Sequence, residues 1–335
     1  MAKVNDGAVP VLEVWRGGLL ESTHLGHAVI CDAKGVVASW GNPEAVIFPR
    51  SSAKMLQALP LIETGAADAR GLSQAHLALS CASHRGAQVH VDLAGRWIAD
   101  LGLSEADLRC GAHEPGDIEE RNRLIRAGEK PCQLHNNCSG KHSGFLTVTQ
   151  HLKAGPEYIE IDHPLQKAIR AATEEVTEET AAGWGVDGCS APNFAMSVGA
   201  LARGMAKFAT AREGHGAREG AMHRLTRAMA AHPHLISGEG QACTELMRAM
   251  DGRVAIKGGA EAVYIAIVPE KGFGIALKVL DGGYRASEAA VAALLAKIGV
   301  LDPAHPAAVK RMAGVQSNWR GMETGVYRLA DGFPG

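Results

Sequence analysis

The sequence predicts an α+β fold in which both ends of the chain build one antiparallel sheet and the middle folds as helices. Three observations predict it: strand-like alternation in residues 1–50, helical spacing of apolar residues across 51–251, and strand-like runs again across 252–335. With 46% hydrophobic residues in 335, the chain has ample material for a core, and we expect residues 1–335 to work as a single catalytic unit.

The first fifty residues contain two strand signals. Residues 11–15 alternate between apolar and other side chains, and residues 27–41 form two β-rich runs around the polar turn Asp32–Gly35. We therefore expect a β-hairpin at residues 27–41.

The middle and the end of the chain differ in the spacing of their apolar residues. Apolar residues recur at three and four positions, as in a helix, in residues 51–63, 91–103, 163–176 and 193–208. Strands return at 261–270 and 272–283, an amphipathic helix follows at 287–300, and a short strand is expected at 325–329.

Composition excludes several classes of partner. The net charge of −2 leaves no basic excess for a phosphate backbone, so a small-molecule substrate is expected rather than nucleic acid. No run of eighteen apolar residues is present, so no membrane span is expected. Seven cysteines at irregular spacing, without a signal-peptide pattern, predict reduced thiols and a cytoplasmic location.

The most informative segment is FPRSSAKMLQ, in which Ser51 and Lys54 lie three residues apart at the start of a predicted helix. That spacing puts both on the same side, whereas Ser52 would not face the lysine. A serine hydroxyl becomes a nucleophile when a neighbouring base takes its proton, and a lysine held neutral can be that base. The alternative is that the serine only caps the helix.

A second lysine supports the catalytic interpretation. Lys257 is followed by Gly258 and Gly259 immediately before a predicted strand, which is similar to the KTG element of serine β-lactamases, although Gly258 replaces the usual hydroxyl residue. Between the two lysines, Ser83 in CASHRG offers a hydroxyl that relays a proton. Without Lys257, a helix end capped by serine and glycine would explain that run equally well.

A cluster of sulfur and nitrogen donors forms a third signal. Cys138 lies in HNNCSGKH, and Cys189 follows about fifty residues later in VDGCSAP. Two thiolates with nitrogen donors suit zinc, but the spacing matches no common zinc motif, and buried structural thiols are the simpler interpretation from chemistry alone.

Five motifs taken in order, PRSSAK, CASHRG, HNNCSGKH, VDGCSAP and IKGGAE, resemble the rhizobial-type L-asparaginases, the class 3 or thermolabile asparaginase II family. The resemblance covers nearly the whole chain. It implies a serine β-lactamase and glutaminase-like fold, a homodimer, and hydrolysis of L-asparagine to aspartate and ammonia through an acyl-enzyme on serine.

The resemblance also implies roles for particular residues. Ser51 with Lys54 and Ser83 with Lys257 would form two linked Ser-Lys pairs, and Arg50 would lie near the substrate.

The resemblance also implies one Zn2+ ion per chain, close to the active site. Its ligands would be Cys138, Lys141 and Cys189, with Asp187 and His142 near the ion and the substrate.

Recognition of a free amino acid requires a cation for the α-carboxylate and an acceptor for the α-ammonium group. Arg50 offers the first, and either Glu239 or Asp187 offers the second. The preference between asparagine and glutamine stays open, because one methylene changes binding by only about 1–3 kcal/mol.

Two other mechanisms are compatible with the motifs. A zinc-dependent amidase would use activated water at Cys138 and Cys189 and leave Ser51 as a cap. A penicillin-binding or β-lactamase-like acyl-serine protein would keep Ser51 as the acylated residue.

Overall fold

The computed structural model describes residues 4–335 and divides the chain into two compact units. The first unit contains the chain up to Ser52, Met196–Thr210 and Glu245–Gly335, and the second contains Ala53–Ala195 and Ala211–Thr244. The first unit takes in residues 51–52, 196–210 and 245–251, which lie between the two chain ends that were expected to form the sheet. That the two act as one catalytic unit stays a prediction.

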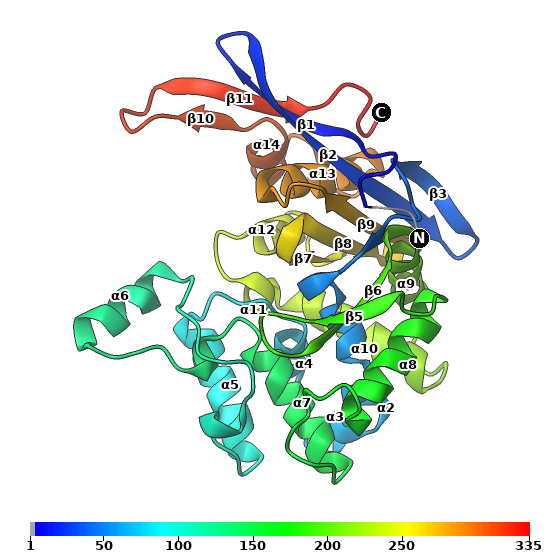
Figure 1. Cartoon of the computed structure of the whole chain (residues 1–335), viewed down its shortest axis with the longest axis vertical. Helices are drawn as coiled ribbons and strands as arrows, with labels where there is room; N and C mark the ends of the chain where they lie inside the picture. Colours follow the sequence, from blue (N-terminus) through cyan, green and yellow to red (C-terminus); the bar gives the residue numbers. More distant parts are fainter. Residues whose placement is uncertain (1–3) are drawn as a thin grey trace. The chain divides into compact units, whose positions relative to one another are not determined.

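The first unit is organised around an eight-stranded antiparallel sheet that draws on both ends of the chain, as predicted. Its strand order is β10-β11-β1-β2-β9-β8-β7, with β3 paired to β2. Strands β1 and β11, from the two ends of the chain, lie side by side (Figure 1), and Leu12 of β1 pairs with Leu329 of β11. The strands are β1 Val9–Arg16, β2 Leu19–Asp32, β3 Gly35–Trp40, β7 Ala255–Gly259, β8 Val263–Val268, β9 Phe273–Val279, β10 Val315–Ser317 and β11 Glu323–Leu329.

Helices α9 (Val198–Thr210) and α13 (Tyr284–Lys297) pack on this sheet, α9 against β2, β8 and β9, and α13 against β1, β8 and β9. Gly274 explains the close approach of α9, because a Cβ there would collide with the backbone of Ala202 and Ala206. The last helices are α12 (Ala242–Ala249), whose first residues belong to the second unit, and α14 (Pro306–Met312).

The second unit is mainly helical, and α7 (Ser139–His151) is the most buried of its longer helices, since all of its residues except Gln150 and His151 are buried. Such all-round burial fits its weakly amphipathic sequence. The other helices of this unit are α1 Lys54–Gln57, α2 Leu59–Glu63, α3 Ala66–Ala69, α4 Gln74–Ser80, α5 Gln88–Asp100, α6 Ile118–Ala127, α8 Pro164–Thr177, α10 Ala217–Ala231 and α11 Pro233–Ser237.

Most predicted elements are confirmed, including the hairpin of β2 and β3 and the helix predicted at 287–300, of which residues 287–297 lie in α13. The helix predicted from residue 193 is wrong at its start, because Pro192–Ser197 is strand β6. All six of its residues are buried, and a short buried apolar run carries no periodicity that separates strand from helix. Strand β6 pairs with β5 (Gly183–Val186) and with β4 (Val46–Ile47).

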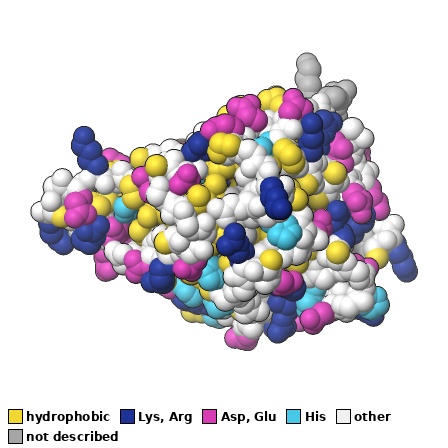
Figure 2. All heavy atoms as spheres, turned by 90° about the horizontal axis from the view of Figure 1, so that it is seen from below, with side chains coloured by type: hydrophobic (Ala, Val, Ile, Leu, Met, Phe, Trp, Pro, Cys, Tyr) yellow, Lys and Arg dark blue, Asp and Glu magenta, His cyan; other side chains and the backbone are white. Residues whose placement is uncertain are grey.

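The surface agrees with the small net charge. On the face drawn in Figure 2, basic and acidic side chains of the described residues are interspersed, and no broad field of one sign covers it. None of the helices within residues 4–335 is long and apolar enough to cross a membrane.

Candidate active site

The turn that carries Ser51 distinguishes it from Ser52. Ser51 lies in the 3₁₀ turn Arg50–Ala53, directly before α1. Ser52 is fully buried, and its hydroxyl donates to the Pro49 carbonyl at 2.7 Å, whereas Ser51 is partly exposed. Arg50 has a φ of 53°, a strained conformation of the kind that clusters at functional sites. The fold therefore uses Ser52 to shape the turn and leaves Ser51 partly exposed, and the assignment of Ser51 as the nucleophile stays a prediction.

The end of β7 packs directly against this turn within the first unit. A Cβ on Gly259 would lie 2.8 Å from the Pro49 carbonyl oxygen and 3.2 Å from the Ser51 nitrogen, so only glycine fits. Lys257, two residues earlier, is buried and donates to the Gly258 carbonyl at 2.5 Å. The structure thus brings the two predicted motifs PRSSAK and IKGGAE together.

Lys54 is the centre of a second cluster, within the helical unit. Its side chain is 1% exposed, and Nζ donates to Ser83 Oγ at 3.0 Å. Nζ also donates to the Ala82 carbonyl and, at 3.5 Å, to the Asn137 carbonyl. The sequence identifies Ser83 but not the two carbonyls, because every residue has a backbone carbonyl and residue type does not mark the ones that accept from Lys54.

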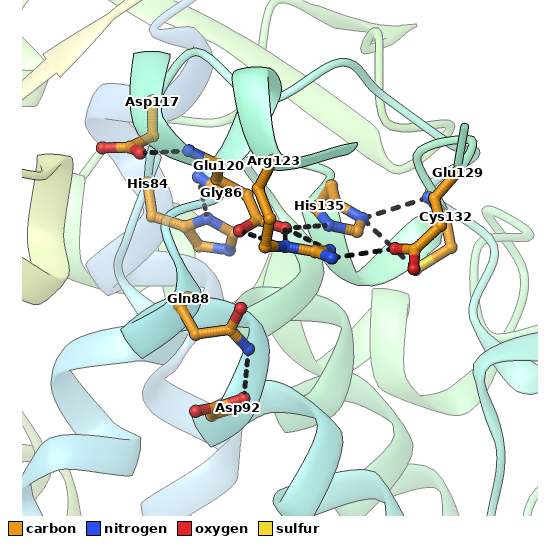
Figure 3. Close-up of polar contacts among 10 residues, drawn as sticks. All are labelled: His84, Gly86, Gln88, Asp92, Asp117, Glu120, Arg123, Glu129, Cys132 and His135. Carbon is orange, nitrogen blue, oxygen red and sulfur yellow. Dashed lines mark hydrogen bonds and ion pairs between the residues drawn. The ribbon is translucent and has the colours of Figure 1, made fainter. Parts of the chain in front are cut away.

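His84, next to Ser83, ties this cluster to the start of α7. Its Nδ1 accepts from the Gly86 N–H at 3.1 Å, as Figure 3 shows, and its Nε2 lies 2.9 Å from Ser139 Oγ. The ring stacks on His90 with centroids 4.7 Å apart. Burial, and then the neighbouring His90 and Lys54, hold the pKa of His84 well below its ordinary value. His84 is therefore neutral, and it links the Lys54 cluster to the start of α7. Its place within the motif CASHRG was the only signal for it in the sequence.

The predicted metal ligands meet in one buried cluster. Lys141 Nζ lies 3.0 Å from Cys189 Sγ. A hydrogen bond from Cys138 holds the pKa of Cys189 well below its ordinary value, while the same bond and burial raise the pKa of Cys138. Burial opposes the charge of Lys141, but the two sulfurs outweigh it and raise the pKa of that amine. Lys141 and Cys138 therefore both donate toward Cys189 within this cluster.

This donor set fits zinc. Sulfur and nitrogen are the atoms that zinc prefers, and two thiolates with one amine leave a fourth tetrahedral position open. No group of three His, Cys, Asp or Glu side chains within residues 4–335 is arranged to hold a metal. Any zinc here would therefore need the amine of Lys141 as its third protein ligand.

The remaining predicted residues lie in different surroundings. His142 is fully buried and bonds to Tyr158 Oη through Nδ1 at 2.9 Å, and burial lowers the pKa of His142 to about 4. Asp187 accepts from the Gly188 N–H at 2.7 Å, and Glu239 is exposed in the segment before α12. Substrate contact by His142, Asp187, Glu239 and Arg50 stays a prediction.

The sequence model of one protein family, described as L-asparaginase II, matches residues 12–329. A search of the curated proteins gave no match. Among solved structures, the chain is similar to a β-lactamase from Mycobacterium bovis, at 13% identity and a TM-score of 0.46, over 81% of this chain and 94% of that one. It is also similar to the native form of a protein called Mglu, at 14% identity and a TM-score of 0.45, over 82% of this chain and 64% of that one. The family match spans nearly the whole chain, which therefore belongs to the L-asparaginase II family.

Proposed function

We propose that this enzyme of the L-asparaginase II family hydrolyses L-asparagine to L-aspartate and ammonia through an acyl-enzyme on Ser51, with Lys54 as the base. The observation that carries the mechanism is the buried Lys54 amine, hydrogen-bonded to Ser83 Oγ at 3.0 Å, three residues along the chain from a partly exposed Ser51. A lysine removed from water is suited to act as a general base.

In the first half-reaction, Ser51 Oγ attacks the side-chain amide carbon of asparagine, and its proton passes to Lys54. The carbon–nitrogen bond then breaks, and the proton moves on to the leaving nitrogen, which departs as ammonia. The backbone N–H of Ser51, in the 3₁₀ turn Arg50–Ala53, would stabilise the oxyanion.

In the second half-reaction, water attacks the aspartyl ester, and the same lysine takes its proton and returns it to Ser51 Oγ. We assign Ser83 and Lys257 to the second Ser-Lys pair, as the family resemblance implies. Ser83 Oγ already accepts from Lys54 Nζ at 3.0 Å, so a second hydroxyl lies beside the amine that acts as the base.

For the substrate's charged groups, we assign Arg50 to the α-carboxylate, because it directly precedes the nucleophile in the strained turn. The α-ammonium group requires a carboxylate, which Asp187 or Glu239 would supply. The family resemblance favours a homodimer, and the seven irregularly spaced cysteines favour action in the cytoplasm.

One zinc ion per chain would be held by Cys138, Lys141 and Cys189. Bound there, zinc would neutralise the two thiolates and hold the first turn of α7 to the Cys189 loop. The ammonia-releasing step is assigned to Ser51 and Lys54 and needs no metal.

Kinetics of three variants test this mechanism. Ser51→Ala and Lys54→Ala should each lower turnover of asparagine by roughly a thousandfold or more, because members of one proton-transfer unit fail together. Ser52→Ala is the matched control: it loses only the bond to the Pro49 carbonyl and should keep most of the activity. Ammonia release by Ser51→Ala at the wild-type rate would contradict the acyl-serine mechanism and favour a zinc-activated water.

A further inference from the structure

One cysteine differs from the other six in its surroundings. Cys132 is partly exposed, whereas every other cysteine of the chain is buried. It lies on the segment between α6 and α7, at the start of the 3₁₀ turn Gln133–His135. Neither the predicted Ser-Lys pairs nor the predicted zinc ligands include it.

His135 is placed to act on this thiol. Its Nδ1 lies 3.3 Å from Cys132 Sγ and 3.1 Å from the backbone nitrogen of Cys132. The backbone N–H can only donate, so Nδ1 carries the lone pair and the proton of the neutral ring lies on Nε2. The same lone pair faces the thiol, which makes His135 an acceptor for its proton.

A carboxylate orients the histidine from the other side, as Figure 3 shows. Glu120 Oε1 lies 3.2 Å from His135 Nε2, and both side chains are buried. Arg123 binds Glu120 at 2.8 Å and, against the cost of burial, holds the pKa of that carboxyl below its ordinary value. The carboxylate is therefore ionised at neutral pH and accepts the Nε2 proton of the ring.

We propose that Cys132 is a thiol-modification site, activated by His135 and Glu120, that takes low-molecular-weight disulfides. A nucleophile hydrogen-bonded to a base that is oriented by a third group is the arrangement that activates cysteine in enzymes. The capping box of this turn uses the side chain and backbone of both Cys132 and His135, but it does not account for the buried Glu120 behind the ring.

The reaction is thiol–disulfide exchange. His135 Nδ1 takes the Cys132 proton, and the thiolate attacks one sulfur of the incoming disulfide. A new bond forms between Cys132 Sγ and that sulfur, the original sulfur–sulfur bond breaks, and the leaving thiolate takes the proton from His135. Excess reducing thiol reverses the exchange.

Two measurements on the folded chain at pH 7 test the proposal. The first follows thiol release from an aromatic disulfide reagent, and the second maps the modified peptides after exposure to oxidised glutathione. One thiol should react in a fast phase and map to Cys132. Cys132→Ser should abolish the fast phase, whereas Cys110→Ser, which removes a nearby buried thiol bonded to Gln133, should keep it.

Two further variants separate activation from simple exposure. Glu120→Gln removes the charge behind His135 and should slow the fast phase about tenfold. Glu129→Gln is its matched control, because Glu129 binds the same arginine, Arg123, at 2.9 Å, whereas Glu120 is the carboxylate at His135 Nε2, so the rate should stay within about twofold.

Two results would overturn the proposal. Modification of another cysteine first would show that Cys132 is not the reactive thiol. Equal fast phases in wild type, Glu120→Gln and His135→Gln would show that it reacts only because it is exposed.

Discussion

Replacing Gly259 by alanine tests whether the end of β7 positions the nucleophile. The new Cβ would lie 2.8 Å from the Pro49 carbonyl oxygen and 2.9 Å from the Ser52 nitrogen, whereas ordinary contact begins at 3.4 Å. All of these neighbours are backbone atoms, so no side-chain rotation relieves the collision. The turn that carries Ser51, or the strand, must move by about half an ångström.

A displacement of that size should be visible in catalysis. Misplacing a reacting group by about 1 Å costs up to about a hundredfold, so Gly259→Ala should lower kcat for asparagine by roughly tenfold or more. The overpacked backbone should also lower the free energy of unfolding by about 1–3 kcal/mol. Coupled ammonia release measures the first effect and denaturant unfolding the second.

Gly220→Ala is the matched control. Gly220 lies within α10, and a Cβ there would meet no atom within 4 Å. Alanine should therefore stabilise the helix by about 1 kcal/mol and leave kcat unchanged. If Gly259→Ala kept the wild-type kcat while remaining folded, the assigned role of this contact would be refuted.

Two further predictions concern the metal and the histidines. Purified protein should contain about one zinc per chain, and Cys138→Ala and Lys141→Ala should each lose it; wild-type zinc content in both variants would eliminate the ligand set. Because burial lowers the pKa of His84 and His90 in the folded state, the unfolded chain binds protons first, and the free energy of unfolding should fall as pH drops below 6.5. His84→Gln should reduce that slope by about 1 kcal/mol per pH unit in urea titrations; an unchanged slope would contradict the assignment.

The sequence was most informative where spacing alone determines structure. Alternation identified β1 and the hairpin of β2 and β3, and three-four spacing identified α8 and α13. It was least informative for β6, whose buried run from Pro192 to Ser197 lacks a distinguishing period. Tertiary pairing with β4 and β5 decides that segment.

The candidate site also combines residues that the sequence identifies with contacts that only the structure shows. Motif chemistry named Ser51, Lys54 and Ser83, and the structure brings Lys54 to Ser83. The contact of Lys54 with the Asn137 carbonyl joins residues 83 positions apart, and chain packing alone creates it. Such long-range backbone partners have no signature in a single sequence.

Trapping the covalent intermediate tests the central claim most directly. The enzyme should be mixed with asparagine, quenched in acid within one turnover and digested with trypsin, which releases Ser51–Lys54 as a tetrapeptide because Arg50 and Lys54 are cleavage sites. We predict an aspartyl ester on this peptide, which fragmentation assigns to Ser51 and not to Ser52, and its absence from Ser51→Ala. Steady ammonia release with no ester on Ser51, or an ester on Ser52, would contradict the mechanism.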